Sequence, residues 1–250
     1  MKDERMMILQ MISDGKVTAD EGAKLLEAIG HAEKAAQKPS IFREIEWMMD
    51  NVLQDNSKKD DPSPRMITIP HDSTIVIKHD AGSLKLLASD NDELCIEGVS
   101  ARNYKIQQDG NSFQIDAKRF GIGMTVRIPK LVRKLIVHST LGKITTENLG
   151  DALDILEIKT HTGSITANMQ TIHSGVYKFT SEVGKIHCYL SPDSTCHIKA
   201  NVDMGNVSSN LALETIEKGT GLLNGKLNDG GAMVELSTHT GKIFVGTKTW

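Results

Sequence analysis

Two copies of the tetrapeptide Thr-His-Thr-Gly are the feature of this sequence that most suggests chemistry. They occupy residues 160–163 and 238–241, and each stands between two short runs in which apolar and polar residues alternate. Imidazole is a common metal ligand and a general base near neutral pH. A pair of such loops could therefore build a metal or catalytic centre. The same repetition would also arise if each copy were one corner of a structural repeat, and the surrounding residues decide between the two.

Glycines recur through the second half of the chain at a regular spacing. From residue 142 to residue 205 they stand 21 residues apart, whereas the next step is 36 residues, which predicts one degenerate copy near Gly221. Periods of this length are typical of repeat architectures. The predicted corners of the repeat are Gly82, Gly142, Gly163, Gly184, Gly205 and Gly241.

Apolar residues keep constant distances from these glycines, at seven and five positions before and two positions after each one. Each copy is therefore predicted to be a strand, a tight corner and a second strand, with one face buried. Stacked copies would bury that face continuously. In sequence order His161 and His239 would lie four coils apart, roughly 19 Å at 4.8 Å per coil, too far to share one zinc ion. The corner interpretation is favoured.

Other residues offer little support for catalysis. The three cysteines, Cys95, Cys188 and Cys196, form no CxxC pair, and Cys188 falls in an inward column with small residues. The glycine cluster of residues 219–225 lacks the Lys-Ser/Thr of a phosphate-binding loop. The sequence predicts no catalytic residue, no metal ligand and no cofactor, so we expect a protein that is not an enzyme. A net charge of −3 and the lack of a basic arm argue against a nucleic-acid partner.

The N-terminal quarter is patterned for helices. Residues 1–38 are predicted to form a helical hairpin, residues 39–54 an amphipathic helix, and residues 55–65 a charged, proline-containing linker to the β domain of residues 66–250. The polar face of the amphipathic helix is mainly acidic, which favours docking on protein, or on a second copy, over an anionic membrane. Any membrane association would then be indirect. The candidate partner face of this helix is Ile41, Ile45, Met48, Met49 and Val52.

No signal-peptide pattern opens the sequence, and no run approaches the roughly 20 apolar residues of a membrane-spanning helix. We expect the protein in the cytoplasm or at the inner membrane face. The alternative is the cell surface, reached by a non-classical route.

Two stretches resemble a known group of proteins. The segment "ERMMILQMISDGKVTADEGAKLLEAI" resembles the SHOCT-like helical hairpin that opens bacterial envelope-stress proteins of the LiaX and YvlB type. The glycine-centred repeat, preceded by "TVRIPK", resembles their C-terminal adhesin-like β-solenoid. The resemblance implies a role in sensing or buffering envelope stress, with phage-shock-type membrane proteins as partners, and it implies no catalytic residue.

The fold class expected is mainly β. It consists of a β-solenoid or β-helix-like C-terminal domain of about 21-residue repeats and a small α-helical N-terminal domain. The leading functional hypothesis is a non-enzymatic binding and scaffold protein for envelope-stress signalling, in which the helices mediate oligomerisation or partner contact and the solenoid displays a surface. The alternative is a self-polymerising cytoskeletal-type solenoid, whose open edge would be the final strand, residues 241–250. A polysaccharide-active enzyme would need a ladder of acidic residues, but the outward columns mix acids and lysines.

Overall fold

The structure is a computed structural model that describes residues 63–118, 121–150 and 153–247. These residues belong to one compact unit. The predicted helical hairpin, the amphipathic helix with its partner face and almost all of the predicted linker lie outside the described residues. The elements are β1 (Arg65–Thr68), β2 (Ser73–Ser89), β3 (Glu93–Glu97), the 3-10 turn η1 (Ala101–Asn103), β4 (Tyr104–Asp109), β5 (Ser112–Ala117), β6 (Ile122–Pro129), β7 (Val132–Glu147), β8 (Ile155–Asn168), β9 (Val176–Tyr189), β10 (Cys196–Ser209), β11 (Glu214–Lys218), β12 (Leu222–Leu227) and β13 (Ala232–Gly246).

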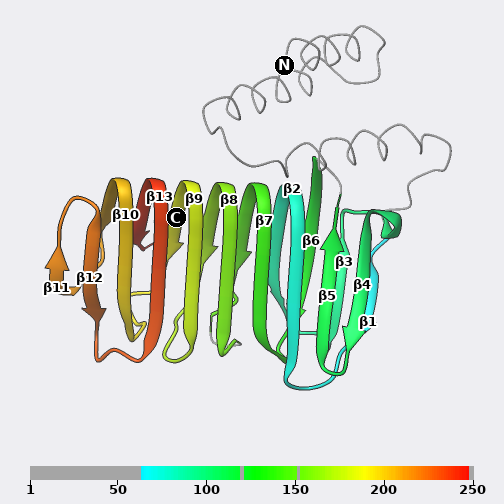
Figure 1. Ribbon diagram of the computed structural model, residues 1–250. Coiled ribbons are helices and arrows are strands. Elements are labelled where there is room, and N and C mark those ends of the chain that lie inside the picture. The colour runs from blue at the N-terminus through cyan, green and yellow to red at the C-terminus, as the bar shows by residue number, and fades with distance from the viewer. Residues whose placement is uncertain (1–62, 119–120, 151–152, 248–250) are drawn as a thin grey trace, which may run out of the picture. The chain divides into compact units, whose positions relative to one another are not determined.

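The expectation of a mainly β protein is confirmed in this part of the chain. One mixed sheet runs in the order β1-β3-β6-β2-β7-β8-β9-β13-β10-β12-β11, with β5 beside β2 and β4 beside β5. Its centre consists of six long strands, β2, β7, β8, β9, β13 and β10, which are parallel to their neighbours. Figure 1 shows these strands as a row of ribbons that each bend over and return behind. We call the residues before the bend the first arm and those after it the second arm.

Each bend contains one of the glycines picked out from the sequence. Gly142 pairs with Gly82 and with Gly163 in the strand register, and the row continues through the remaining bends. Gly163 has φ +148°, a backbone conformation that residues with a side chain rarely adopt. A Cβ atom built on Gly163 would also overlap the carbonyl oxygen of Gly142. The bend therefore requires glycine for its conformation and for its close stacking.

The order of the last long strands differs from the order along the chain. Strand β13 lies between β9 and β10, so Gly241 pairs with Gly184 on one side and with Gly205 on the other. The prediction that the copy of Gly205 follows that of Gly184 in space is wrong. The two copies carry glycine and aliphatic residues at matching positions, so either strand fits against β9.

The degenerate copy predicted near Gly221 is also wrong. Gly221 immediately precedes β12, which runs antiparallel to the first arm of β10 over Cys196–Asn201. Strand β11 then pairs with β12 as the outermost strand. The segment therefore covers part of the edge of β10 and adds no parallel unit. The predicted open edge at residues 241–250 is wrong for β13 itself, because β13 is paired on both sides.

The core follows the predicted alternation. Along β8, buried positions alternate with partly exposed ones on both arms, and Leu156, Ile158 and Ile165 are inaccessible to solvent. Burying each such side chain contributes about 1.5–3 kcal/mol. The stack loosens at β10, where Val207 is only partly buried although its counterpart Ile243 is fully buried. Strand β12 pairs with the first arm of β10, and the turn before it adds one hydrogen bond to the second arm, from the backbone N–H of Val207 to the carbonyl oxygen of Thr220 at 2.9 Å.

Within the described ranges, no helix is long and apolar enough to cross a membrane.

Candidate binding groove

The two Thr-His-Thr-Gly copies lie at bends, and their histidines are closer than sequence order predicted. His161 on β8 and His239 on β13 are separated only by β9, which amounts to about 10 Å between backbones instead of 19 Å. The Nδ1 atom of His161 lies 2.7 Å from a carboxylate oxygen of Glu182. The Nδ1 atom of His239 lies 2.8 Å from a carboxylate oxygen of Asp203. Each imidazole thus has its own carboxylate.

These four side chains occupy one column, two residues before each glycine. Glu182 and Asp203 stand at the same distance from their bend glycines as the two histidines. This shared position in the sequence could have predicted that each histidine lies beside a carboxylate. All four side chains are about half exposed or more. Across the described ranges no three His, Cys, Asp or Glu side chains converge in a way that could hold a metal ion.

The first threonine of each tetrapeptide has a structural role. Thr160 and Thr238 are buried, and their hydroxyls donate hydrogen bonds to carbonyls two residues later, Thr162 at 3.5 Å and Thr240 at 3.4 Å. The hydroxyl satisfies a backbone acceptor within the bend, where the neighbouring glycine leaves no side chain to do so. The tetrapeptide therefore has a physical reason to recur at a bend.

The cysteines are buried free thiols. Burial raises the pKa of Cys196 to about 11 and raises the pKa of Cys188 further. The pKa of Cys95 is also raised, first by burial and then by its contact with Glu97. A thiol reacts as the thiolate. Because the pKa of each cysteine is raised, the thiols remain protonated and unreactive near neutral pH.

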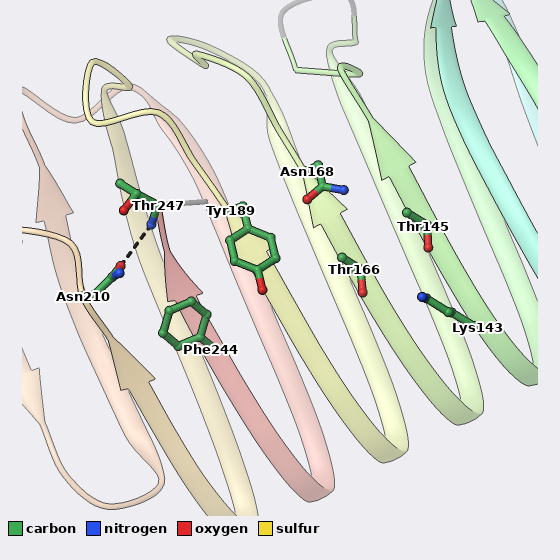
Figure 2. A pocket seen from close by; sticks show the side chains of 8 residues that line it. All are labelled: Lys143, Thr145, Thr166, Asn168, Tyr189, Asn210, Phe244 and Thr247. Atoms are coloured by element: carbon green, nitrogen blue, oxygen red, sulfur yellow. Dashed lines mark hydrogen bonds between the residues drawn. The ribbon is translucent and has the colours of Figure 1, made fainter. Parts of the chain in front are cut away.

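A groove of about 530 Å³ crosses the outer face of the second arms (Figure 2). It extends from Lys143 at one end to Asn210 and Thr247 at the other. Most of its lining comes from two columns, three and five residues after the bend glycines. The lining residues are Lys143, Thr145, Thr166, Asn168, Tyr189, Asn210, Phe244 and Thr247.

Aromatic rings form one wall of the groove. The ring centroids of Tyr189 and Phe244 lie 5.9 Å apart in a tilted arrangement, and the ring of His187 lies 6.2 Å from each. Desolvation, followed by the charge of Lys185, lowers the pKa of His187. The imidazole is therefore neutral at pH 7 and belongs to an uncharged aromatic cluster.

The backbone beside these rings is tightly packed. Gly246 pairs with Tyr189 at the position five residues after the bend. A Cβ atom on Gly246 would clash with the side-chain oxygen of Asn210 and with the ring of Phe244. Glycine here lets the Phe244 ring and the Asn210 amide pack against the backbone, and the Asn210 oxygen accepts a hydrogen bond from the backbone N–H of Thr247 at 3.0 Å.

One polar atom of the groove lining is covered by its neighbours. The side-chain oxygen of Asn168 is buried and has no hydrogen-bond partner among the described residues. A buried polar atom without a partner costs about 1–3 kcal/mol, and because this oxygen is covered it is not exposed to a ligand in the groove. Sequence reasoning missed the groove, because its residues fall in outward columns that were taken as solvated surface.

Comparison with known proteins identifies the N-terminal segment and the fold. A family model described as a SHOCT-like domain matches residues 3–34. No curated protein matches the chain. Among solved structures, a candidate cell adhesion protein from Clostridium sporogenes ATCC 15579 is similar over 75% of this chain and 100% of its own, with 13% identity and a TM-score of 0.58. A candidate adhesin, BF0245 from Bacteroides fragilis NCTC 9343, matches over 74% of this chain and 98% of its own, with 11% identity and a TM-score of 0.27.

The similarity to the Clostridium sporogenes protein concerns the fold. The chain thus combines a SHOCT-like segment with a β fold found in a candidate adhesion protein.

Proposed function

We propose that this chain is a non-enzymatic binding and scaffold protein that acts in the sensing of, or response to, cell-envelope stress. The glycine-cornered strands are interpreted as stacked units of a β-solenoid that displays an extended outer surface. The N-terminal helices would mediate self-association or contact with protein partners, of which phage-shock-type membrane proteins are the proposed class. The proposed location is the cytoplasm or the inner membrane face.

The groove on the second arms is the observation that supports a binding role most directly. It combines a volume suited to a small ligand, one aromatic wall and a lining of hydroxyl and amide groups. Side chains that could react are otherwise engaged: the histidines at the bends are paired with carboxylates and the thiols are buried. The SHOCT-like segment and the resemblance to envelope-stress proteins support the cellular role.

Light scattering and membrane fractionation of the full-length chain test the scaffold role. We expect the wild-type protein to form an oligomer in solution, or to sediment with membranes in extracts of its own cells. The double variant Ile45→Lys, Met49→Lys should lose both properties, because two charges would interrupt the proposed partner face. A matched control, Glu46→Lys, places its charge on the polar face and should keep them. A wild-type protein that is strictly monomeric and absent from the membrane fraction would refute the scaffold role.

Self-polymerisation is the second candidate, and the end of the stack favours it. The second arm of β10 pairs with β13 on one side, whereas β12 covers only the first arm on the other. Met204 is 63% exposed there. An incompletely covered strand edge can template another strand. Electron microscopy of the purified full-length protein separates the candidates, since filaments indicate polymerisation and discrete particles indicate the scaffold.

A further inference from the structure

A row of lysines runs along the groove, one residue after the bend glycines. In strand order from β2 to β10 the row reads Ser83, Lys143, Ser164, Lys185, Lys242 and Asn206. The row contains three cations and no carboxylate. Lys185 and Lys242 are direct neighbours in the register of β9 and β13, so their ammonium groups repel one another at a strand spacing of about 4.8 Å.

None of the three lysines has an ion-pair partner among the residues that the structure describes. Some other lysines of the sheet have a carboxylate partner, whereas Lys159 and Lys199 have none among the described residues. Lys178 on a first arm contacts Glu235 at 2.8 Å, and Lys85 on a second arm contacts Glu147 at 3.2 Å. Three unmatched cations along one line, in a chain whose net charge is −3, form a local positive stripe. A ligand with acidic groups would complete the pairing.

The aromatic wall beside the lysines favours a ligand that also carries sugar rings. The C–H faces of a sugar ring are apolar and slightly positive, and they pack well against the negative face of an aromatic ring. Tyr189 and Phe244 present two rings at the surface of the groove. The remaining lining is hydroxyl and amide groups, which can both donate to and accept from sugar hydroxyls.

The geometry points to an acidic oligosaccharide as the ligand of this groove. We propose that the chain lies across the second arms, packs sugar rings on Tyr189 and Phe244, and directs its acid groups to the stripe of Lys143, Lys185 and Lys242. This inference rests on the proposed binding function and specifies its ligand class.

A nucleic acid would use the same groups less well. Single-stranded nucleic acids bind through several stacked bases in a strongly basic groove. Here only two large rings line the groove, its charge is limited to Lys143 in the lining and Lys185 and Lys242 beside it, and the chain as a whole is negative. A neutral sugar would leave the lysines unmatched. An acidic oligosaccharide can pack on the two rings, form hydrogen bonds with the hydroxyl and amide groups, and pair its acid groups with the lysines.

Isothermal titration calorimetry of the full-length protein tests the proposal, with tetragalacturonic acid as the acidic probe and maltotetraose as the neutral one. We expect the acidic probe to bind with Kd below about 1 mM, and the neutral probe at least about tenfold more weakly. Phe244→Ala should weaken binding of the acidic probe by at least about tenfold, through loss of ring contact. Lys185→Ala combined with Lys242→Ala should weaken it similarly and reduce its dependence on salt.

Lys199→Ala is the matched control, because Lys199 is an exposed lysine on the first arm of β10, away from the groove. It should bind the acidic probe as the wild type does. Thermal melts confirm that each variant is folded. The absence of binding up to about 10 mM acidic probe would overturn the proposal, as would binding that Phe244→Ala leaves unchanged. Tighter binding of a tetrathymidylate, lost in the same variants, would instead assign the groove to nucleic acid.

The outcomes separate this proposal from the broader one. If the titrations fail while the oligomer and membrane measurements succeed, the ligand assignment is wrong and the scaffold function stands. If the acidic probe binds but the protein is a monomer absent from membranes, the groove is a binding site and the scaffold role is wrong.

Discussion

Replacement of the central bend glycine, Gly163→Ala, is the sharpest test of how this fold is held together. Gly163 has φ +148° and stacks directly between Gly142 and Gly184. Alanine in this conformation costs about 1–3 kcal/mol. The added methyl group would also overlap the carbonyl oxygen of Gly142. Relief requires the two strands to separate at the bend, which weakens one or two backbone hydrogen bonds worth about 1 kcal/mol each.

The expected loss of stability is therefore about 2–5 kcal/mol, a large share of the 5–15 kcal/mol of a typical domain. Urea denaturation monitored by far-ultraviolet circular dichroism would measure it. Two other glycines divide the loss into its parts. Gly110 has φ +56° but an open space around its Cβ position, so Gly110→Ala reports conformation alone, at about 1–2 kcal/mol. Gly219 has open space and no such conformation, so Gly219→Ala should change stability by less than about 0.5 kcal/mol.

The ranking of the three variants decides whether the reasoning is right. If close stacking of the bends contributes to stability, Gly163→Ala is the most destabilising of the three by at least about 1 kcal/mol. If Gly163→Ala and Gly110→Ala destabilise equally, close stacking at the bends contributes nothing measurable. If Gly163→Ala behaves like Gly219→Ala, the glycine row has no role in stability.

Three further outcomes are expected. Tyr177→Phe should cost about 1–2 kcal/mol in urea melts, because the buried hydroxyl donates to the carbonyl oxygen of Gly150 at 2.7 Å and its loss orphans that acceptor; an unchanged midpoint would contradict the assignment. Cys196 should resist Ellman's reagent at pH 8 and react after unfolding. The pKa of Cys196 is raised in the folded state, so its contribution to the free energy of unfolding is complete below the ordinary thiol pKa of 9.0 and falls as the pH rises toward 11. Cys196→Ala should flatten that part of the pH–stability curve. Ile186→Asp should prevent folding because Ile186 is inaccessible to solvent, whereas Val207→Asp at the loose end of the stack should cost much less, as expression and melting would show.

Local patterns in the sequence were enough to predict the strands and their bends. The alternation around Leu156 and Ile165 reflects one buried face, and the period of two leaves little choice of register once a bend is placed. Gly163 marks the bend because no other residue tolerates its conformation and its neighbours. These are constraints within one strand or between a strand and an equivalent copy, so a single sequence can carry them.

The order of the strands and the groove were decided by the tertiary structure. The copies centred on Gly205 and Gly241 present equivalent edges to β9, so position along the chain did not determine which one would lie there. The insertion of β13 brings Phe244 next to Tyr189, 55 residues earlier in the sequence, and so builds the aromatic wall of the groove. The two strands carry the same alternating apolar pattern, so that pattern alone does not determine which of them pairs with β9. The packing of the folded chain determines it.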